Sequence, residues 1–408
     1  MFSSRIDWCV EPNRLMAILE QKKQNHIPIL DLTDTNPTTA GLVYDSDAIQ
    51  QWVSQTDILL YHPDSKGSMA ARESIAEYYR DHGQPVNPDQ VFLTASTSEA
   101  YAFVLKLLCD PGDEILVPQP SYPLFDFLAA WESVSLKPYP LVYSSRSGWQ
   151  IDMDRLLDAV SHRCRAIVVV NPNNPTGSFF KPADLKHIDN LCRRFDLALI
   201  VDEVFLDYPS KKHNVTVNTA AGHIRSLTFT LSGLSKICGV PQLKLGWIHV
   251  SGSDSLVQAA TTRLELIADT YLSVSTPVQV AAPHLLMNRQ KIQDQIQIRI
   301  EANEKYLQNT IVNHQRFVPY RREGGWYQVL SIPDGGSDEE LACHLLEQDD
   351  LLVHPGYFYD LDENFPCLVL SLITPPHTFQ AGICRLMKKG KGSGSEGQRH
   401  RVTKKNGN

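Results

Sequence analysis

The chain has 408 residues, of which 42% are apolar and 21% charged, values typical of a soluble globular protein. One hydrophobic core rarely serves a chain of this length, so we expect more than one domain. The formal net charge is −8, which argues against nucleic acid as the main partner. Residues 388–408 carry seven Lys or Arg and one acid, so this segment holds about +6 and the rest about −14.

The N-terminus lacks a charged and then apolar signal pattern, and no apolar run approaches the length of a membrane span. Eight cysteines are scattered without Cys-x-x-Cys or Cys/His ligand spacing. We therefore expect a cytoplasmic protein with free thiols, no metal site and no membrane contact.

The first 50 residues combine a predicted helix at 13–23, an apolar run at 27–32 and a Pro- and Gly-bearing loop at 36–41. From about residue 62 helices and strands alternate. The predicted helices are 68–79, 99–108, 152–160 and 183–195, and the predicted strands are 91–94, 114–117, 166–170, 197–201, 227–231 and 245–250. These strands are continuous apolar runs, which indicates a mainly parallel sheet buried on both faces. Ligands bind such sheets at the carboxyl ends of the strands.

A long helix is predicted at 290–310, followed by strands at 327–330, 351–353 and 368–372 and a helix at 339–347. This α+β pattern predicts a smaller domain built from both chain ends. The expected organisation is residues 1–50 and 290–387 in the small domain, 51–289 in a large α/β domain, and a disordered basic tail at 388–408. The tail contains a formal G-x-G-x-x-G at 392–397, but no strand precedes it and no helix follows, so we reject a nucleotide site.

Lys236 lies just after the strand predicted at 227–231, in Ser232-Gly233-Leu234-Ser235-Lys236. Apolar surroundings disfavour an ammonium and lower its pKa, which would free the amine as a nucleophile. Such a lysine can form a Schiff base with an aldehyde cofactor. Taken alone, a solvated lysine at a strand end is the commoner explanation.

Four other strand ends carry polar or aromatic residues. Thr97 and Ser98 open a helix and suit a phosphate, or they simply cap that helix. Tyr122, in a Pro-rich loop, could stack on a flat ring or belong to the core. Asn174 lies in Asn-Pro-Asn-Asn-Pro-Thr-Gly. This segment either holds the Asn174 side chain in place as a hydrogen-bond donor or is a simple β-turn. Asp202 ends a buried strand and needs a cation or donor, or it caps a neighbouring loop.

Together these residues, in this order and spacing, resemble the class I/II aminotransferases, which are fold type I enzymes that depend on pyridoxal 5′-phosphate (PLP). The similarity runs from about residue 31 to residue 387 and also includes Tyr61 with Gly67 and Arg72. The resemblance implies that Lys236 forms the Schiff base and moves a proton. It implies that Asp202 pairs with the ring nitrogen, Asn174 donates to the ring oxygen and Tyr122 stacks on the ring. Phosphate contacts would come from Thr97, Ser98 and Ser235, and Tyr61 would reach the phosphate in the neighbouring subunit of a homodimer.

Two departures concern the cofactor. The position of the usual phosphate-binding arginine is Lys244, which keeps the charge but loses the bidentate fork. The position of a tyrosine that usually donates to the ring oxygen is Phe205. Loss of that donor should raise the pKa of the Schiff base.

A third departure concerns the substrate. The usual carboxylate-binding arginine corresponds to Val369 in Leu-Val-Leu-Ser-Leu, so the expected anchor is missing. Asn36 is our candidate substrate contact, and Arg321, Arg322 and Arg385 are other possible anchors.

The resemblance favours an aminotransferase that moves an amino group between an L-amino acid and a 2-oxo acid, in a biosynthetic process. A PLP-dependent carbon–sulfur β-lyase, or other chemistry at the α-carbon, stays open because the cofactor shell is shared. A PLP-binding regulator is a third possibility, although no helix-turn-helix is evident.

Overall fold

The fold is described from a computed structural model of the chain, over residues 1–8, 11–211, 219–222, 224–272, 274–312, 316–333 and 335–388. The predicted tail and the motif at 392–397 therefore lie outside the described residues, apart from Lys388. The helices are α1 (Arg14–Gln24), α2 (Ser46–Val53), α3 (Met69–Asp81), α4 (Thr97–Leu108), α5 (Phe125–Trp131), α6 (Met153–Asp158), α7 (Pro182–Phe195), α8 (Leu234–Ile237), α9 (Asp254–Tyr271), α10 (Thr276–Met287), α11 (Gln290–Ile311), α12 (Asp338–Asp349) and α13 (Pro376–Lys388). The strands are β1 (Leu30–Asp31), β2 (Val91–Thr94), β3 (Glu114–Gln119), β4 (Ser135–Ser144), β5 (Gly148–Ile151), β6 (Cys164–Val170), β7 (Ala198–Asp202), β8 (Thr228–Gly233), β9 (Gly246–Ser251), β10 (Val318–Pro319), β11 (Tyr327–Ser331), β12 (Leu351–Leu352), β13 (His354–Pro355) and β14 (Cys367–Ser371).

The large sheet has eight strands in the order β2-β9-β8-β7-β6-β3-β4-β5. Its centre, from β8 to β4, is parallel, as the continuous apolar runs predicted. The prediction was wrong for β9, which pairs antiparallel with both β8 and β2, whereas β2 runs in the same direction as the central strands. Both faces of β7 and β8 are buried, so their carboxyl ends are held in fixed positions at one edge of the sheet.

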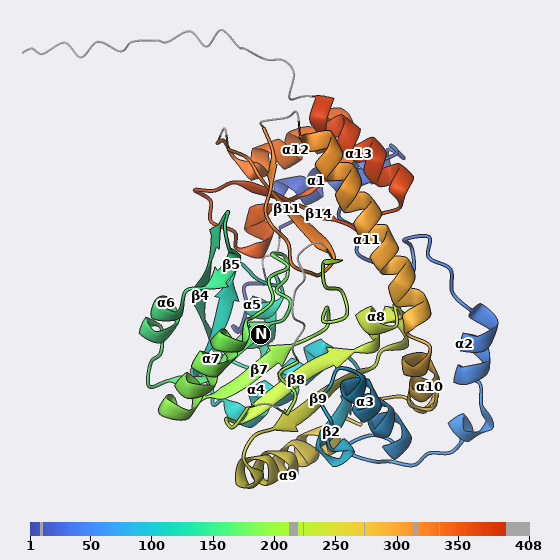
Figure 1. Cartoon of the computed structure of the whole chain (residues 1–408), viewed down its shortest axis with the longest axis vertical. Helices are drawn as coiled ribbons and strands as arrows, with labels where there is room; N and C mark the ends of the chain where they lie inside the picture. Colours follow the sequence, from blue (N-terminus) through green and yellow to red (C-terminus); the bar gives the residue numbers. More distant parts are fainter. Residues whose placement is uncertain are drawn as a thin grey trace, which may run out of the picture.

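A second sheet of four strands has the order β10-β11-β14-β13 and is antiparallel throughout. A short parallel pair, β1 with β12, joins the N-terminal segment to the C-terminal part of the chain. In Figure 1, β11 and β14 lie above the large sheet, and α11 runs beside both parts. Side chains of α11 and β14 share one hydrophobic cluster with Phe205 and Tyr208, which follow β7. The second sheet therefore packs directly on the segment that leaves the carboxyl end of β7.

Two local predictions needed correction. Lys236 lies in the short helix α8 rather than at a strand end, because β8 continues to Gly233. The cap of α4 is Ser96, which accepts a hydrogen bond from the Glu99 amide at 3.2 Å, so Thr97 and Ser98 are the first helical residues.

No helix in the described ranges is long and apolar enough to cross a membrane. The same residues contain no group of His, Cys, Asp and Glu side chains arranged to hold a metal ion.

Candidate active site

The amine of Lys236 is enclosed by aromatic rings. Its Nζ lies 4.8 Å from the ring centroid of Trp326 and 5.6 Å from that of Phe205. The backbone of the lysine is fixed by the Tyr208 hydroxyl, which donates to the Lys236 carbonyl at 2.6 Å. Burial lowers the Lys236 pKa to about 8, although the nearby Asp34 carboxylate opposes this shift. The neutral fraction near neutral pH is therefore larger than that of an ordinary lysine, which makes this amine a competent nucleophile.

Asp202 is the last residue of β7, and its side chain is buried. The Tyr101 hydroxyl donates to Oδ2 at 3.2 Å and the Val204 amide donates to Oδ1 at 3.1 Å. Burial raises the Asp202 pKa to about 6, against these two hydrogen bonds. A buried carboxylate of this kind gains most from a cationic partner, and a protonated ring nitrogen is such a partner.

Glu203, next in the chain, serves the loop that follows. Its carboxylate accepts from the Thr219 hydroxyl at 2.6 Å and from the Ala220 amide at 2.7 Å. The loop-capping alternative considered for Asp202 therefore describes its neighbour Glu203.

Burial raises the Glu203 pKa from its ordinary 4.5 to about 7. The Glu203 pKa is higher in the folded state than in the unfolded state. Its contribution to the stability of the protein is therefore complete below about pH 4.5 and is lost as the pH rises to about 7. We expect the free energy of unfolding of the apoprotein to fall over this range by roughly 3 kcal/mol from Glu203, since one pKa unit is worth about 1.4 kcal/mol. Urea unfolding at a series of pH values should show that the free energy of unfolding falls less steeply with pH in Glu203→Gln than in wild type. Equal slopes in the two proteins would contradict the assignment.

The start of α4 lies against the start of β9 at a glycine. A Cβ on Gly246 would come within 3.0 Å of the Thr97 amide nitrogen, so only glycine allows this approach. Because Ser96 caps the helix, the Thr97 and Ser98 hydroxyls are not used for capping. Amide donors, two hydroxyls and the positive end of a twelve-residue helix suit a phosphate.

The other two proposed phosphate contacts come from segments close to these. Ser235 lies half-buried in α8, one residue before Lys236. Lys244 is exposed and has a positive φ of 56°, just before β9 begins at Gly246. The segments that carry Thr97, Ser235 and Lys244 are therefore adjacent, because β9 lies between the start of α4 and the end of β8.

Asn174 and Tyr122 come from two loops that contact each other. The Asn173 side-chain Nδ2 donates to the Pro120 carbonyl at 3.3 Å, which holds the two loops together. The Asn174 side chain is buried, and its Oδ1 has no hydrogen-bond partner within the described part of the chain. Burial raises the pKa of Tyr122 to about 12, with a further contribution from Asp202, so its hydroxyl stays neutral near that carboxylate. A buried Oδ1 without a partner is typical of a site that a ligand or a water completes.

Val369, which the sequence places where the carboxylate arginine is expected, lies in a buried position. Val369 is 1% exposed and lies between Val329 of β11 and His354 of β13. The three alternative arginines have other partners: Arg321 donates to the Arg146 carbonyl, Arg322 to Glu304 and Arg385 to the Asp349 carbonyl.

The β1 loop contributes an acid to the site. The exposed Asn36 accepts from the amide and hydroxyl of Thr38, at 3.0 and 2.8 Å, and so closes its own turn. Two residues earlier, the Asp34 carboxylate is close enough to raise the pKa of Lys236. The sequence had not singled out Asp34, Trp326, Tyr327 or Tyr101. Nothing in the local pattern marks them, because they meet the site only through the fold.

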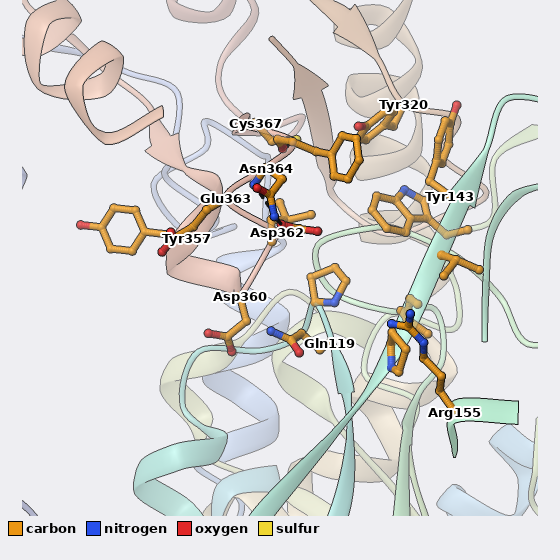
Figure 2. Close-up of a pocket in the computed structure, with 17 residues that line it drawn as sticks. Gln119, Tyr143, Arg155, Tyr320, Tyr357, Asp360, Asp362, Glu363, Asn364 and Cys367 are labelled. Atoms are coloured by element: carbon orange, nitrogen blue, oxygen red, sulfur yellow. Dashed lines mark hydrogen bonds between the residues drawn. The ribbon is translucent and has the colours of Figure 1, made fainter. Parts of the chain in front are cut away.

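A separate groove of about 920 Å³ lies between β4 and the segment around residues 360–367. Figure 2 shows Tyr143 and Arg155 on one wall and Asp360, Asp362 and Glu363 on the other. Lys236, Asp202 and Asn174 do not line it, so this groove is distinct from the candidate active site.

The chain belongs to the family of class I and II aminotransferases, whose pattern it matches over residues 37–367. It is 26% identical over 322 residues to nicotianamine aminotransferase 1 of Oryza sativa, covering 76% of this chain and 64% of that protein. It is 27% identical over 358 residues to glutamate-pyruvate aminotransferase AlaA of Haemophilus influenzae, covering 85% and 87%. Its fold matches an alanine aminotransferase structure from Pyrococcus furiosus with a TM-score of 0.86 and 22% identity, over 96% of this chain and 100% of that one. The predicted family, fold type and class of enzyme are confirmed.

The chain thus spans somewhat less than two thirds of the length of the rice relative, at 64%. The residues present fit the cofactor that this family uses. The Nδ2 group of the buried Asn174 suits a ring-oxygen donor, and the Gly246 contact with the start of α4 suits a phosphate cradle. Lys236 and the buried Asp202 suit an attachment point and a ring-nitrogen partner.

Proposed function

We propose that this chain is a PLP-dependent aminotransferase that moves an amino group between an L-amino acid and a 2-oxo acid. The observation that carries the proposal is the placement of the Lys236 amine in α8, directly after β8, and of the buried Asp202 carboxylate at the end of the neighbouring strand β7. When bound, PLP supplies an electron-withdrawing ring that stabilises negative charge at the substrate Cα. The protein supplies the attachment point, the proton transfer and the electrostatics.

The roles follow from chemistry and burial. Lys236 Nζ holds the cofactor and, once displaced by the substrate amine, moves a proton at the substrate Cα as general base and acid. A pKa of about 8 suits this work near neutral pH. The Asp202 carboxylate keeps a proton on the ring nitrogen, Asn174 donates to the ring oxygen, and Tyr122 covers one face of the ring. The phosphate is held by Thr97, Ser98, Ser235 and Lys244.

We further propose a cytoplasmic homodimer in which Tyr61 reaches the partner's phosphate site. Tyr61 is 73% exposed in the single chain, and apolar neighbours in sequence and space are exposed as well, namely Leu59, Leu60, Leu266 and Leu272. A shallow hollow of about 60 Å³ lined by both Tyr61 and Leu272 shows that the two segments adjoin. An exposed apolar surface next to an unused aromatic fits a second copy of the chain.

Leu266→Glu should therefore weaken the dimer, because Leu266 is 72% exposed in the single chain and would carry a charge into the interface. Sedimentation velocity should show a shift toward monomer at low micromolar protein. Val312→Glu is the matched control, since Val312 is 77% exposed on another part of the surface. A monomeric wild type, or equal behaviour of both variants, would contradict the interface.

Incubation with a panel of L-amino acids tests the reaction. An aminotransferase releases the 2-oxo acid in an amount equal to the bound cofactor and needs an added oxo acid to continue. A carbon–sulfur β-lyase, the alternative that Val369 keeps open, releases pyruvate and thiol continuously from cysteine-type substrates without an oxo acid. No product from any amino acid would leave a PLP-binding regulator and overturn the proposal.

A further inference from the structure

The replacement of the usual tyrosine by Phe205 leaves the ring oxygen of the cofactor with Asn174 as its one proposed donor. Phe205 is 4% exposed and its ring lies 5.6 Å from Lys236 Nζ. Two aromatic side chains at the start of β11 pack edge-on against it, Trp326 at 5.4 Å and Tyr327 at 6.0 Å between ring centroids. The Phe205 ring therefore lies between the lysine and Tyr327, which the sequence predicts only as the start of a strand.

Tyr327 faces the site because of the register of its strand. It pairs directly with Ser371 of β14, and the Leu372 amide donates to the Trp326 carbonyl at 2.8 Å beside this pair. Side chains alternate along a strand, so Tyr327 shares a face with Val329 and, across the pair, with Val369. Val329 and Val369 belong to the hydrophobic cluster that includes Leu199 and Val201 of the large sheet. That face therefore points toward the large sheet and its strand ends.

The Tyr327 hydroxyl meets Asn174 at the far end of the ring. Asn174 and Thr35 contact this hydroxyl as hydrogen-bond partners that lower the Tyr327 pKa, while burial, the larger effect, raises it. The hydroxyl therefore keeps its proton at neutral pH and can act as a donor. The Asn174 amide beside it is buried with an unused Oδ1. The donors at this position are the Tyr327 hydroxyl and the Asn174 Nδ2 group, so a ligand oxygen placed beside them could accept from both.

We propose that Tyr327 supplies the hydrogen-bond donor to the ring oxygen of PLP that Phe205 cannot supply. The inference rests on the proposed binding of PLP at Lys236. In this chain the donor comes from β11, at Tyr327, and not from the segment after β7, and the Tyr327 hydroxyl lies beside Asn174. Tyr327 is then a cofactor-binding residue, and its hydroxyl lowers the pKa of Lys236 Nζ in the holoenzyme by stabilising negative charge on the ring oxygen.

The test is a spectroscopic pH titration of the holoenzyme without substrate, following the visible absorption band of bound PLP. Tyr327→Phe should raise the midpoint by about half to one pH unit, the equivalent of one hydrogen bond. Tyr359→Phe is the matched control. Its ring also lies 6.0 Å from that of Tyr327, but its hydroxyl pairs with His354 Nδ1 at 3.1 Å, so the midpoint should not move.

Restoring a hydroxyl at the usual place gives a second arm. Phe205→Tyr should return the midpoint of Tyr327→Phe toward the wild-type value, and should shift the wild type less than it shifts the Tyr327→Phe variant. An unchanged midpoint in folded Tyr327→Phe, even with a raised KM, would overturn the inference and assign Tyr327 to the substrate. If Tyr327→Phe does not fold, Tyr327→Trp replaces it. The inference is then overturned if Phe205→Tyr shifts the midpoint by the same amount in wild type and in Tyr327→Trp. A wild type that shows no visible band with PLP would instead refute cofactor binding itself.

Discussion

Lys236→Ala is expected to abolish transamination, with kcat falling by about 10⁴-fold or more, because proton transfer by a positioned group alone contributes about 10²–10⁴-fold. The variant also loses the covalent hold on the cofactor. Sodium borohydride, which makes the link between lysine and PLP permanent, should add the cofactor mass to wild type and nothing to the variant. Peptide mapping by mass spectrometry should place that mass on Lys236.

Lys244→Ala is the matched control for this experiment. It also removes a lysine near the proposed phosphate site, but the side chain is exposed and no proton transfer is assigned to it. Its expected effect is a weaker affinity for PLP, with turnover preserved at saturating cofactor. Full turnover in Lys236→Ala, or labelling of another lysine in wild type, would refute the attachment point.

Asp202→Asn should lower kcat by about two to three orders of magnitude, the usual cost of removing one preorganised electrostatic partner. Asparagine has nearly the same shape, and its Oδ1 can still accept from the Val204 amide. What it lacks is the charge that keeps a proton on the ring nitrogen. Steady-state kinetics at saturating PLP measures the change in kcat.

The same substitution should change the pH dependence of PLP binding. In wild-type apoprotein the Asp202 pKa is about 6, so PLP affinity should weaken as pH falls below this value and the carboxylate becomes neutral. Asp202→Asn should lose this dependence, whereas Glu203→Gln should keep it because Glu203 faces Thr219 and Ala220. A kcat for Asp202→Asn within a few-fold of wild type would refute the assigned role.

The parallel centre of the large sheet could be predicted because its strands are apolar on both faces. The direction of β9 could not, since a strand buried on both faces has the same composition whether it runs parallel or antiparallel. The hairpin of β4 and β5 was missed for the opposite reason. β4 is largely solvent-facing and contains Pro138 and Pro140, which are typical of loops or edge strands.

The candidate site shows a similar division. Lys236, Asp202 and Asn174 stand out in the sequence because each ends or closely follows a continuous apolar run. Tyr327 and Asp34 do not stand out, because their importance depends on proximity to Asn174 and Lys236, which lie far away in the chain. The missing arginine at Val369 was visible in the sequence, but its apolar surroundings required the fold.

The contact between Asn174 and Tyr327 joins two bodies of secondary structure. Asn174 follows β6 of the large sheet, whereas Tyr327 begins β11 of the four-stranded sheet. A hydrogen bond is lost once its heavy atoms separate beyond about 3.5 Å, so a small displacement of one sheet against the other would remove a donor from the cofactor. The visible absorption of the bound cofactor would then serve as a spectroscopic measure of how closely the two sheets approach each other.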